Sequence, residues 1–117
     1  MKLIRIKELL KADVLCLEEC LDNEIKIACG SDLMSDVLAF IKPNALLLTG
    51  LTNSQVVRTA EMAEVSAICF VRGKTPDTNT IELAKERKIP LLTTKYSMYE
   101  CCGRLYQNGL PACGIPK

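Results

Sequence analysis

Short apolar runs recur along the chain and are separated by segments with helical periodicity. Residues 45–48 and 67–71 form two such runs, and each stops at a pair that contains glycine. Runs of this length without alternation are typical of strands buried on both faces of a parallel sheet. Between the two runs, Val56, Val57 and Ala60 recur at helical spacing. This order predicts a parallel strand–helix–strand unit with a right-handed crossover.

Similar patterns predict the other elements. Further strands are expected at residues 14–17, 25–29 and 91–94. Helices are expected from residue 4 or 5 to 11, from 31 or 32 to 42, from 52 onwards, from 76 to about 88 and from 97 to about 108. Together these elements predict an α/β fold, a three-layer sandwich with a mainly parallel sheet of about five strands and helices on both faces.

Polar residues at the expected helix starts indicate caps. Ser31 or Asp32 is expected to cap the helix whose buried face carries Met34, Val37, Leu38 and Ile41. Thr52 and Gln55 have the spacing of a capping box, which predicts that the next helix begins at Thr52.

The later helices carry stronger end signals. Pro76 suits the first helical position, where a missing N–H costs nothing. Ser97 and Glu100 form a second capping box at the start of the last helix, and Gly109 is expected at its C-terminal end. The buried stripe of that helix is predicted to contain Met98, Cys101, Cys102, Leu105 and Tyr106.

Length and composition indicate one domain over residues 1–117, with a loosely held tail at residues 110–117. Hydrophobic residues make up 49% of the chain, charged residues 25%, and the net charge is only +1. Without a clustered basic excess we expect no nucleic-acid partner. Without an apolar run of about 20 residues we expect no membrane span. The charged N-terminal residues argue against a signal peptide, so we expect a cytoplasmic protein.

Seven cysteines and no histidine constrain the chemistry. The odd number, and the absence of any C-x-x-C pair, favour reduced core thiols over a disulfide framework or a metal site. We expect Cys29, Cys69 and at least one of Cys101 and Cys102 to be buried. Such use of thiols suits a reducing, anaerobic cytoplasm.

No catalytic constellation is found, so we expect no catalytic residues, no metal and no cofactor. Gly73-Lys74-Thr75 follows a strand as the end of a P-loop does, but position 68, where the loop needs glycine, is Ile. A triad with histidine is excluded within the chain. Asp32 and Asp36 lie four residues apart and either bind Mg²⁺ or, as we favour, interact with a helix N-terminus.

A candidate ligand site is indicated by the position of residues at the ends of the predicted strands. In open parallel sheets, ligands bind beyond the carboxyl ends of the strands, next to helix N-termini that attract anions. Small anions or nucleotides are therefore the expected ligands, and the alternative is that these residues simply form tight turns. The candidate residues are Gly30, Ser31, Asp32, Thr49, Gly50, Thr52, Asn53, Arg72, Gly73 and Lys74.

Three stretches carry a resemblance to a known family. They are ACGSDLMSDVLAF at residues 28–40, LLLTGLTNSQVVRTAEM at 46–62 and ICFVRGKTPDTNTIELAKERKIPLL at 68–92. Over residues 13–109 the chain resembles the DRTGG domain family. It departs from the residues that name the family: Thr52-Asn53 stands near the Asp-Arg position, and Val71-Arg72-Gly73 stands at the Thr-Gly-Gly position.

The resemblance implies a non-catalytic accessory or regulatory module that pairs with its own kind. Such domains accompany phosphotransacetylases, CBS-domain pyrophosphatases and relatives of cobyrinic-acid synthase, and they resemble the N-terminal domain of HPr kinase/phosphorylase. Stand-alone copies near hydrogenase genes imply a metabolic or hydrogenase-related enzyme as a possible partner.

Two functions therefore stay open. The first is a regulatory or protein-interaction module that forms a homodimer, because Tyr99, Tyr106, Leu33 and Phe40 lie beside or off the expected buried helix faces. The alternative is a protein that binds a small anion or nucleotide at the strand ends, or an accessory to a phosphotransfer enzyme.

Overall fold

The structure, a computed structural model, describes residues 1–113 and contains a five-stranded sheet. In spatial order the strands are β1 (Asp13–Cys16), β5 (Leu91–Thr93), β4 (Ala67–Phe70), β3 (Ala45–Thr49) and β2 (Ile27–Gly30). Strands β2 to β5 run parallel, whereas β1 lies antiparallel to β5. The predicted α/β fold with a mainly parallel sheet is confirmed.

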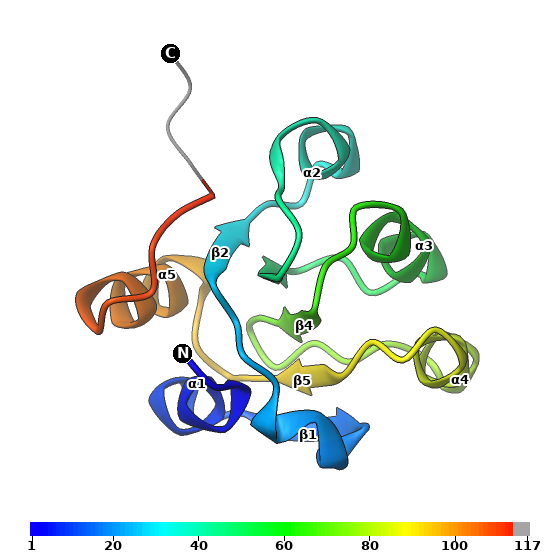
Figure 1. The fold of residues 1–117 in the computed structure, drawn as a ribbon. Helices are drawn as coiled ribbons and strands as arrows, with labels where there is room; N and C mark the ends of the chain where they lie inside the picture. The colour runs from blue at the N-terminus through cyan, green and yellow to red at the C-terminus, as the bar shows by residue number, and fades with distance from the viewer. Residues whose placement is uncertain (114–117) are drawn as a thin grey trace.

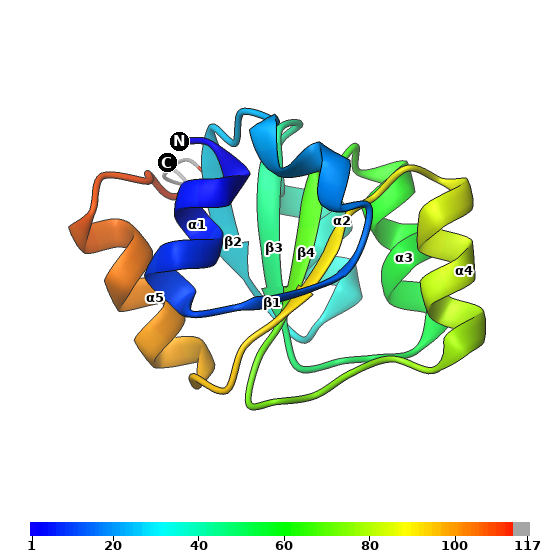
Figure 2. The same ribbon diagram turned by 90° about the horizontal axis from the view of Figure 1, so that it is seen from below.

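Helices cover both faces of this sheet, as Figures 1 and 2 show. On one face α1 packs against α5, and on the other α3 lies between α2 and α4. A short 3₁₀ helix at Glu18–Asp22 leads from β1 towards β2. The helix bounds are α1 (Leu3–Leu10), α2 (Met34–Phe40), α3 (Ser54–Met62), α4 (Thr78–Glu86) and α5 (Met98–Gln107).

Two apolar layers, one on each face of the sheet, form the core. Alternate residues of a strand point to opposite faces. Leu46 and Leu48 of β3 therefore join Ile6 in the layer under α1 and α5, whereas Leu47 joins Phe70 in the layer under α2, α3 and α4. Because both faces are covered, the whole of β3 is buried, which explains its unbroken apolar run.

The start of α2 differs from the prediction. The helix begins at Met34, after Leu33 in the N-cap position, and no side chain caps it. The Ser31 hydroxyl instead accepts a hydrogen bond from the Leu33 N–H at 3.0 Å. Asp32 binds the end of β3 rather than the helix. The predicted cap at Ser31 or Asp32 is therefore wrong, because tertiary partners take the carboxylate.

The starts of α3 and α4 also differ. α3 begins at Ser54 without a side-chain cap, so the capping box of Thr52 and Gln55 is wrong. The chain is still turning before Thr52, where the Leu51 N–H binds the Thr49 hydroxyl at 3.2 Å.

In α4 the cap is Asp77, whose carboxylate accepts the Thr80 N–H at 2.8 Å. Pro76 therefore lies before the helix and not at its first position. Asp77 is the better N-cap because its side chain accepts a hydrogen bond from a free backbone N–H of the first turn. Pro76 has no side-chain acceptor that could do so.

The last helix follows the prediction more closely. Ser97 caps α5 by accepting the Glu100 N–H at 3.2 Å. The Glu100 carboxylate does not return to the cap, because it pairs with Arg104 at 2.8 Å. Gly109 follows the helix with φ of +99°, a conformation that favours glycine.

Some residues lie on other faces than the helical periodicity predicted. Leu38 of α2 is 47% exposed, and Cys102 and Tyr106 of α5 are exposed. All seven cysteines are free thiols; Cys69 and Cys101 are buried as expected, whereas Cys29 is only half-buried. Cys29 is less covered because β2 is an edge strand.

The segment after α5 lies against the sheet. Leu110 is buried, the Ala28 N–H donates to the Pro111 carbonyl at 3.0 Å, and Ala28 pairs with Ala112 in a parallel bridge. This part of the predicted loose tail is therefore packed against β2. Residues 114–117, the rest of that tail, lie outside the described residues.

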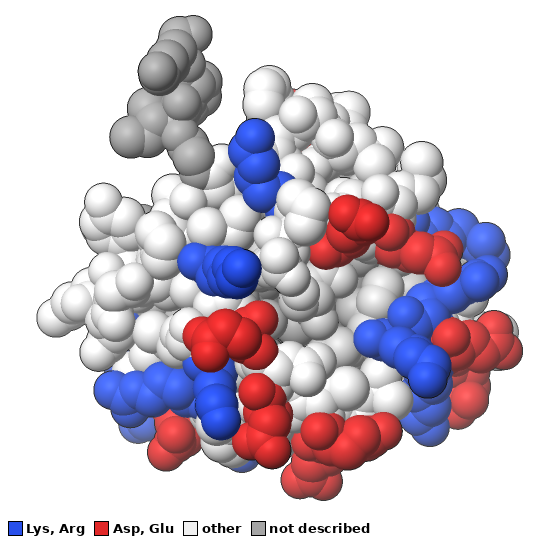
Figure 3. All heavy atoms as spheres, viewed as in Figure 1, with Lys and Arg blue, Asp and Glu red and all other residues white. Residues whose placement is uncertain are grey.

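Charged side chains are unevenly spread over the surface. In the view of Figure 3 they gather around β1 and α4, in the lower and right-hand parts, whereas the parts over α5 and α2 carry few. Among residues 1–113, none of the helices has the length and apolar character needed to cross a membrane.

Candidate functional site

The structure divides the predicted strand-end residues into two groups. Seven lie at or just after the ends of β2 and β3, and three follow β4; they do not converge on one cavity. The first group is Gly30, Ser31, Asp32, Thr49, Gly50, Thr52 and Asn53, and the second is Arg72, Gly73 and Lys74.

In the first group, the Asp32 carboxylate already occupies the place of an anion. Its Oδ1 accepts the Thr49 hydroxyl at 2.9 Å and the Gly50 N–H at 2.7 Å. A bound anion would have to displace this carboxylate or lie beside its charge. Gly30 faces α5 instead, because a Cβ there would lie 3.1 Å from the Cys102 sulfur. The ends of β2 and β3 are therefore joined by a structural contact.

The second group forms a loop that is tied to the end of β5. The Arg72 N–H donates to the Tyr96 carbonyl at 2.8 Å, and the Gly73 N–H donates to the Thr94 carbonyl at 2.7 Å. The Thr93 hydroxyl donates to the Lys74 carbonyl at 2.7 Å. These three hydrogen bonds fix the loop after β4 against the segment after β5.

A cavity of about 560 Å³ lies beside this loop, beyond the carboxyl ends of β4 and β5. Its size falls within the range of roughly 300–1,000 Å³ that is typical of ligand pockets. Because β1 is antiparallel to β5, the start of β1 reaches the same edge. The cavity is lined by Lys11, Asp13, Gly73, Thr75, Thr93, Thr94, Lys95 and Tyr96.

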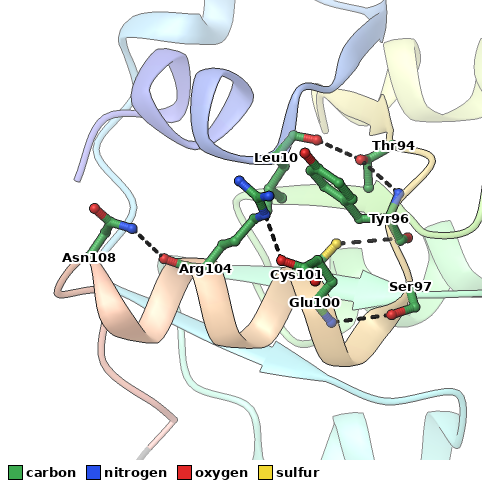
Figure 4. A network of polar contacts seen from close by, with 8 residues as sticks. All are labelled: Leu10, Thr94, Tyr96, Ser97, Glu100, Cys101, Arg104 and Asn108. Carbon is green, nitrogen blue, oxygen red and sulfur yellow. Dashed lines mark hydrogen bonds and ion pairs between the residues drawn. The ribbon is translucent and has the colours of Figure 1, made fainter.

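The wall of the cavity is held from both sides (Figure 4). The buried Thr94 hydroxyl donates to the Leu10 carbonyl at the end of α1 at 2.6 Å and accepts the Tyr96 N–H at 3.3 Å. From α5, the Arg104 guanidinium lies over the Tyr96 ring, 4.2 Å from its centroid, while Glu100 binds Arg104. The ring of Tyr96 is therefore preorganised by a cation–π contact.

The charges of the lining favour an anionic ligand. Lys11 and Lys95 contribute two ammonium groups, and Asp13 contributes one carboxylate. The side chains of all three are exposed and available to a ligand. Thr93 and Thr94 use their hydroxyl protons within the fold, so they shape the cavity rather than donate to a ligand.

Of the predicted site residues, Gly73 alone lines this cavity. Lys11, Asp13, Lys95 and Tyr96 were missed. Thr93 and Thr94 carried a signal, because they end a predicted strand like the residues that were chosen. Lys11 and Asp13 carried none, because local patterning does not reveal that β1 pairs with β5.

A second cavity, of about 340 Å³, is mostly apolar and lies between β2, α5 and residues 110–113. Three thiols line it: Cys29, Cys102 and Cys113. Burial, with smaller contributions from the neighbouring Cys113 and Cys102 thiols, raises the pKa of Cys29 to about 11. Across residues 1–113, no group of three or more Cys, Asp or Glu side chains has the arrangement of a metal site.

Comparison with known proteins places the fold. The sequence profile of the family described as DRTGG domain matches residues 5–107. No curated protein matches the chain significantly. Among solved structures, the chain is similar to the CBS and DRTGG domains of the regulatory region of Clostridium perfringens pyrophosphatase, complexed with its activator diadenosine tetraphosphate. The TM-score is 0.73 at 21% sequence identity.

That match covers 96% of this chain and 48% of the pyrophosphatase chain, so this protein spans about half of its length. At this sequence identity, the likeness is one of fold.

Proposed function

Because the chain belongs to the DRTGG domain family, we propose that it is a regulatory module that acts by binding a partner rather than by catalysing a reaction. The family membership agrees with the resemblance read from the sequence. The partner that the surface supports best is a second copy of the chain, in a two-fold pair, which is the commonest arrangement of small oligomers.

The observation that carries this proposal is a surface of exposed large apolar side chains around the edge of the sheet. α2 and α5 flank β2 at this edge (Figure 1). Phe40 is 62% exposed and Tyr106 is 72% exposed. We call this surface the β2 face, and define it by Leu33, Leu38, Phe40, Tyr99 and Tyr106.

Several properties of the β2 face are those of an interface. Aromatic residues are enriched and charged residues are depleted at the centres of interfaces. The surface over α2 and α5 has few charges in Figure 3. Apolar surface beyond a few hundred Å² is uncommon on monomers. Association of two copies through this face would remove the apolar side chains from water.

Light scattering at micromolar concentration tests the pair. We expect a mass near twice 12.9 kDa. Phe40→Glu should return the mass to that of one chain, because a charge would be buried without a partner. Met62→Glu is the matched control, since Met62 is 72% exposed but lies on α3 and not on the β2 face. A mass of 12.9 kDa for the unaltered chain would contradict the homodimer.

A second candidate function is the binding of a small anionic ligand, such as a nucleotide or a phosphorylated metabolite. The cavity beyond β4 and β5 favours it, because Lys11 and Lys95 stand at its wall and Tyr96 offers an aromatic ring. The predicted site runs from the ends of β2 and β3 to the loop after β4; its Gly73 lines this cavity, whereas at its other end Asp32 opposes an anion.

Thermal-shift measurements with nucleotides and phosphorylated metabolites test the ligand site. We take a compound that raises the midpoint of thermal unfolding. The double variant Lys11→Ala with Lys95→Ala should weaken its binding by about tenfold, the expected loss of two partly exposed ion pairs with the ligand. Arg72→Ala with Lys74→Ala is the control, because these side chains do not line the cavity. An equal loss in both double variants, or no response to any compound, would count against the site.

A further inference from the structure

We propose that Cys29 and Cys113 are a redox-sensitive pair that forms a reversible disulfide and locks residues 110–113 onto the edge of β2. Both cysteines line the cavity of about 340 Å³ between β2, α5 and this segment. The proposal rests on the register of the two segments and on the thiols that they bring together.

The register places the two cysteines side by side. Ala28 of β2 pairs with Ala112 in a parallel bridge, and the Ala28 N–H donates to the Pro111 carbonyl at 3.0 Å. Cys29 and Cys113 each follow a bridged residue by one position. Paired parallel segments lie about 4.8 Å apart, and residues in equivalent positions point to the same side. This separation falls within the roughly 4.4–6.8 Å between Cα atoms that a disulfide spans.

The side chains themselves agree with this register. The Cys113 thiol donates to the Ala28 carbonyl at 3.3 Å, which holds it next to β2. Of the two neighbouring thiols, Cys113 raises the pKa of Cys29 more than Cys102 does. Cys102 lies on α5, with its sulfur against Gly30, and is the competing partner that any test has to separate.

The chemistry is thiol–disulfide exchange with a small disulfide as the oxidant. The Cys113 thiolate attacks one sulfur of the small disulfide, its S–S bond breaks, and the first small thiol leaves with a proton. Cys29 then loses its proton to solvent and attacks the Cys113 sulfur, and the second small thiol leaves. Two electrons pass from the cysteines to the oxidant, which becomes two thiols.

The order of attack follows from the surroundings. The thiolate is the reactive form, and burial in the cavity disfavours it at Cys29. Cys113 is half-buried in the segment that covers β2. Cys113 therefore reacts first with the oxidant, and Cys29 resolves the mixed disulfide.

The consequence is control of the sheet edge. β2 is an edge strand, and an uncovered edge presents backbone groups to which another strand can add. In the reduced protein, a few hydrogen bonds and the buried Leu110 hold the covering segment. The disulfide holds the segment on this edge covalently, whereas after reduction only these noncovalent contacts hold it, and local opening can expose the edge.

Oxidised glutathione, a small disulfide, tests the pair on the full chain. After incubation, intact-mass measurement should show the loss of two hydrogen atoms, and peptide mapping should link Cys29 to Cys113. Cys29→Ser should instead keep a glutathione adduct on Cys113. Cys102→Ser is the matched control and should form the same link as the unaltered chain. A link that involves Cys102, or adducts without any internal link, would overturn the proposal.

Hydrogen exchange tests the lock on the same samples. The Ala28 amide, which binds Pro111, should exchange more than about fivefold more slowly after oxidation, because local opening of the segment is suppressed. The Leu47 amide in the buried strand β3 is the internal reference and should not change. Equal exchange of the Ala28 amide in the two states would mean that the disulfide does not lock the edge.

Discussion

At the scale of single residues, Asp32 joins two strand ends through one carboxylate oxygen. It lies just after β2 and binds the last residue of β3, Thr49, and the Gly50 N–H that follows. Thr49 is fully buried, so its hydroxyl depends on this acceptor. A charged acceptor makes both bonds stronger than neutral ones.

Asp32→Ala should therefore lower the free energy of unfolding by about 1–3 kcal/mol, because a buried hydroxyl and a backbone N–H lose their partner. Asp36→Ala is the matched control: this aspartate is exposed on α2, and its removal should change stability by at most about 0.5 kcal/mol. Urea unfolding followed by circular dichroism measures both. Equal stability of the two variants would show that the Asp32 contacts contribute nothing.

The two aspartates also show what sequence reasoning reaches at this scale. Asp32 and Asp36 lie four residues apart, and in the sequence both are acids near the start of a predicted helix. Their difference arises from Thr49, which β3 brings alongside across a parallel pair. Local sequence patterns do not contain that contact. The sequence therefore indicates Asp32 as a candidate residue but does not predict that it binds Thr49.

At the scale of elements, the helix starts differ in how they are stabilised. Ser97 and Asp77 each accept a backbone N–H from the residue three positions later. Asn53 occupies the same position before α3 without a side-chain hydrogen bond. A residue type that favours caps therefore does not guarantee a cap.

Ser97→Ala should lower the free energy of unfolding by about 1 kcal/mol, the usual effect of losing a cap. Asn53→Ala should have a clearly smaller effect, since no cap hydrogen bond is lost there. Thermal unfolding of the two variants under identical conditions compares them. A larger loss for Asn53→Ala would contradict the assignment of the caps.

The strands were predicted better than the helix starts, for a physical reason. An unbroken apolar run such as ALLLT at β3 is required by burial on both faces, so the pattern and the element coincide. A helix start depends on one or two hydrogen bonds of about 1 kcal/mol each. A contact such as that between Asp32 and Gly50 easily outweighs them.

At the scale of the whole molecule, the buried thiols make stability depend on alkaline pH. Burial, together with nearby Cys102 and Glu100, raises the pKa of Cys101 from 9.0 to about 11. Burial also raises the pKa of Cys69. The folded state therefore keeps protons that the unfolded chain loses. The contribution of the protonated Cys101 thiol to the free energy of unfolding is complete below pH 9.0 and is lost as the pH rises through about 11.

The free energy of unfolding should accordingly drop between about pH 9 and pH 11, by about 1.4 kcal/mol per pH unit for each such thiol. Urea titrations at about pH 8 and about pH 10 measure the slope. Cys101→Ala should reduce the slope by the share of this thiol and leave the share of Cys69. A slope that Cys101→Ala does not alter would count against the role of this thiol.

Sheet order explains why the cavity beyond β4 and β5 escaped sequence reasoning. The parallel units were readable because each strand and the next helix are neighbours in the chain. The pairing of Asp13 with Thr93 joins distant segments and, together with the hydrogen bond from Thr94 to the Leu10 carbonyl, brings Lys11 to the cavity wall. The fold class thus follows from local pattern, whereas the composition of the site follows from long-range pairing.

The same long-range pairing has a consequence for the protein as it leaves the ribosome. α1 and β1 are synthesised well before their partners, α5 and β5, with three strands and three α-helices in between. Until those residues emerge, the apolar side of α1, with Leu3, Ile6 and Leu10, lacks the part of its cover that β5 and α5 provide. Contacts between such distant segments form late, because the intervening chain has to close first. We therefore expect α1 to stay an incompletely covered amphipathic segment, prone to association with other chains, until α5 is made.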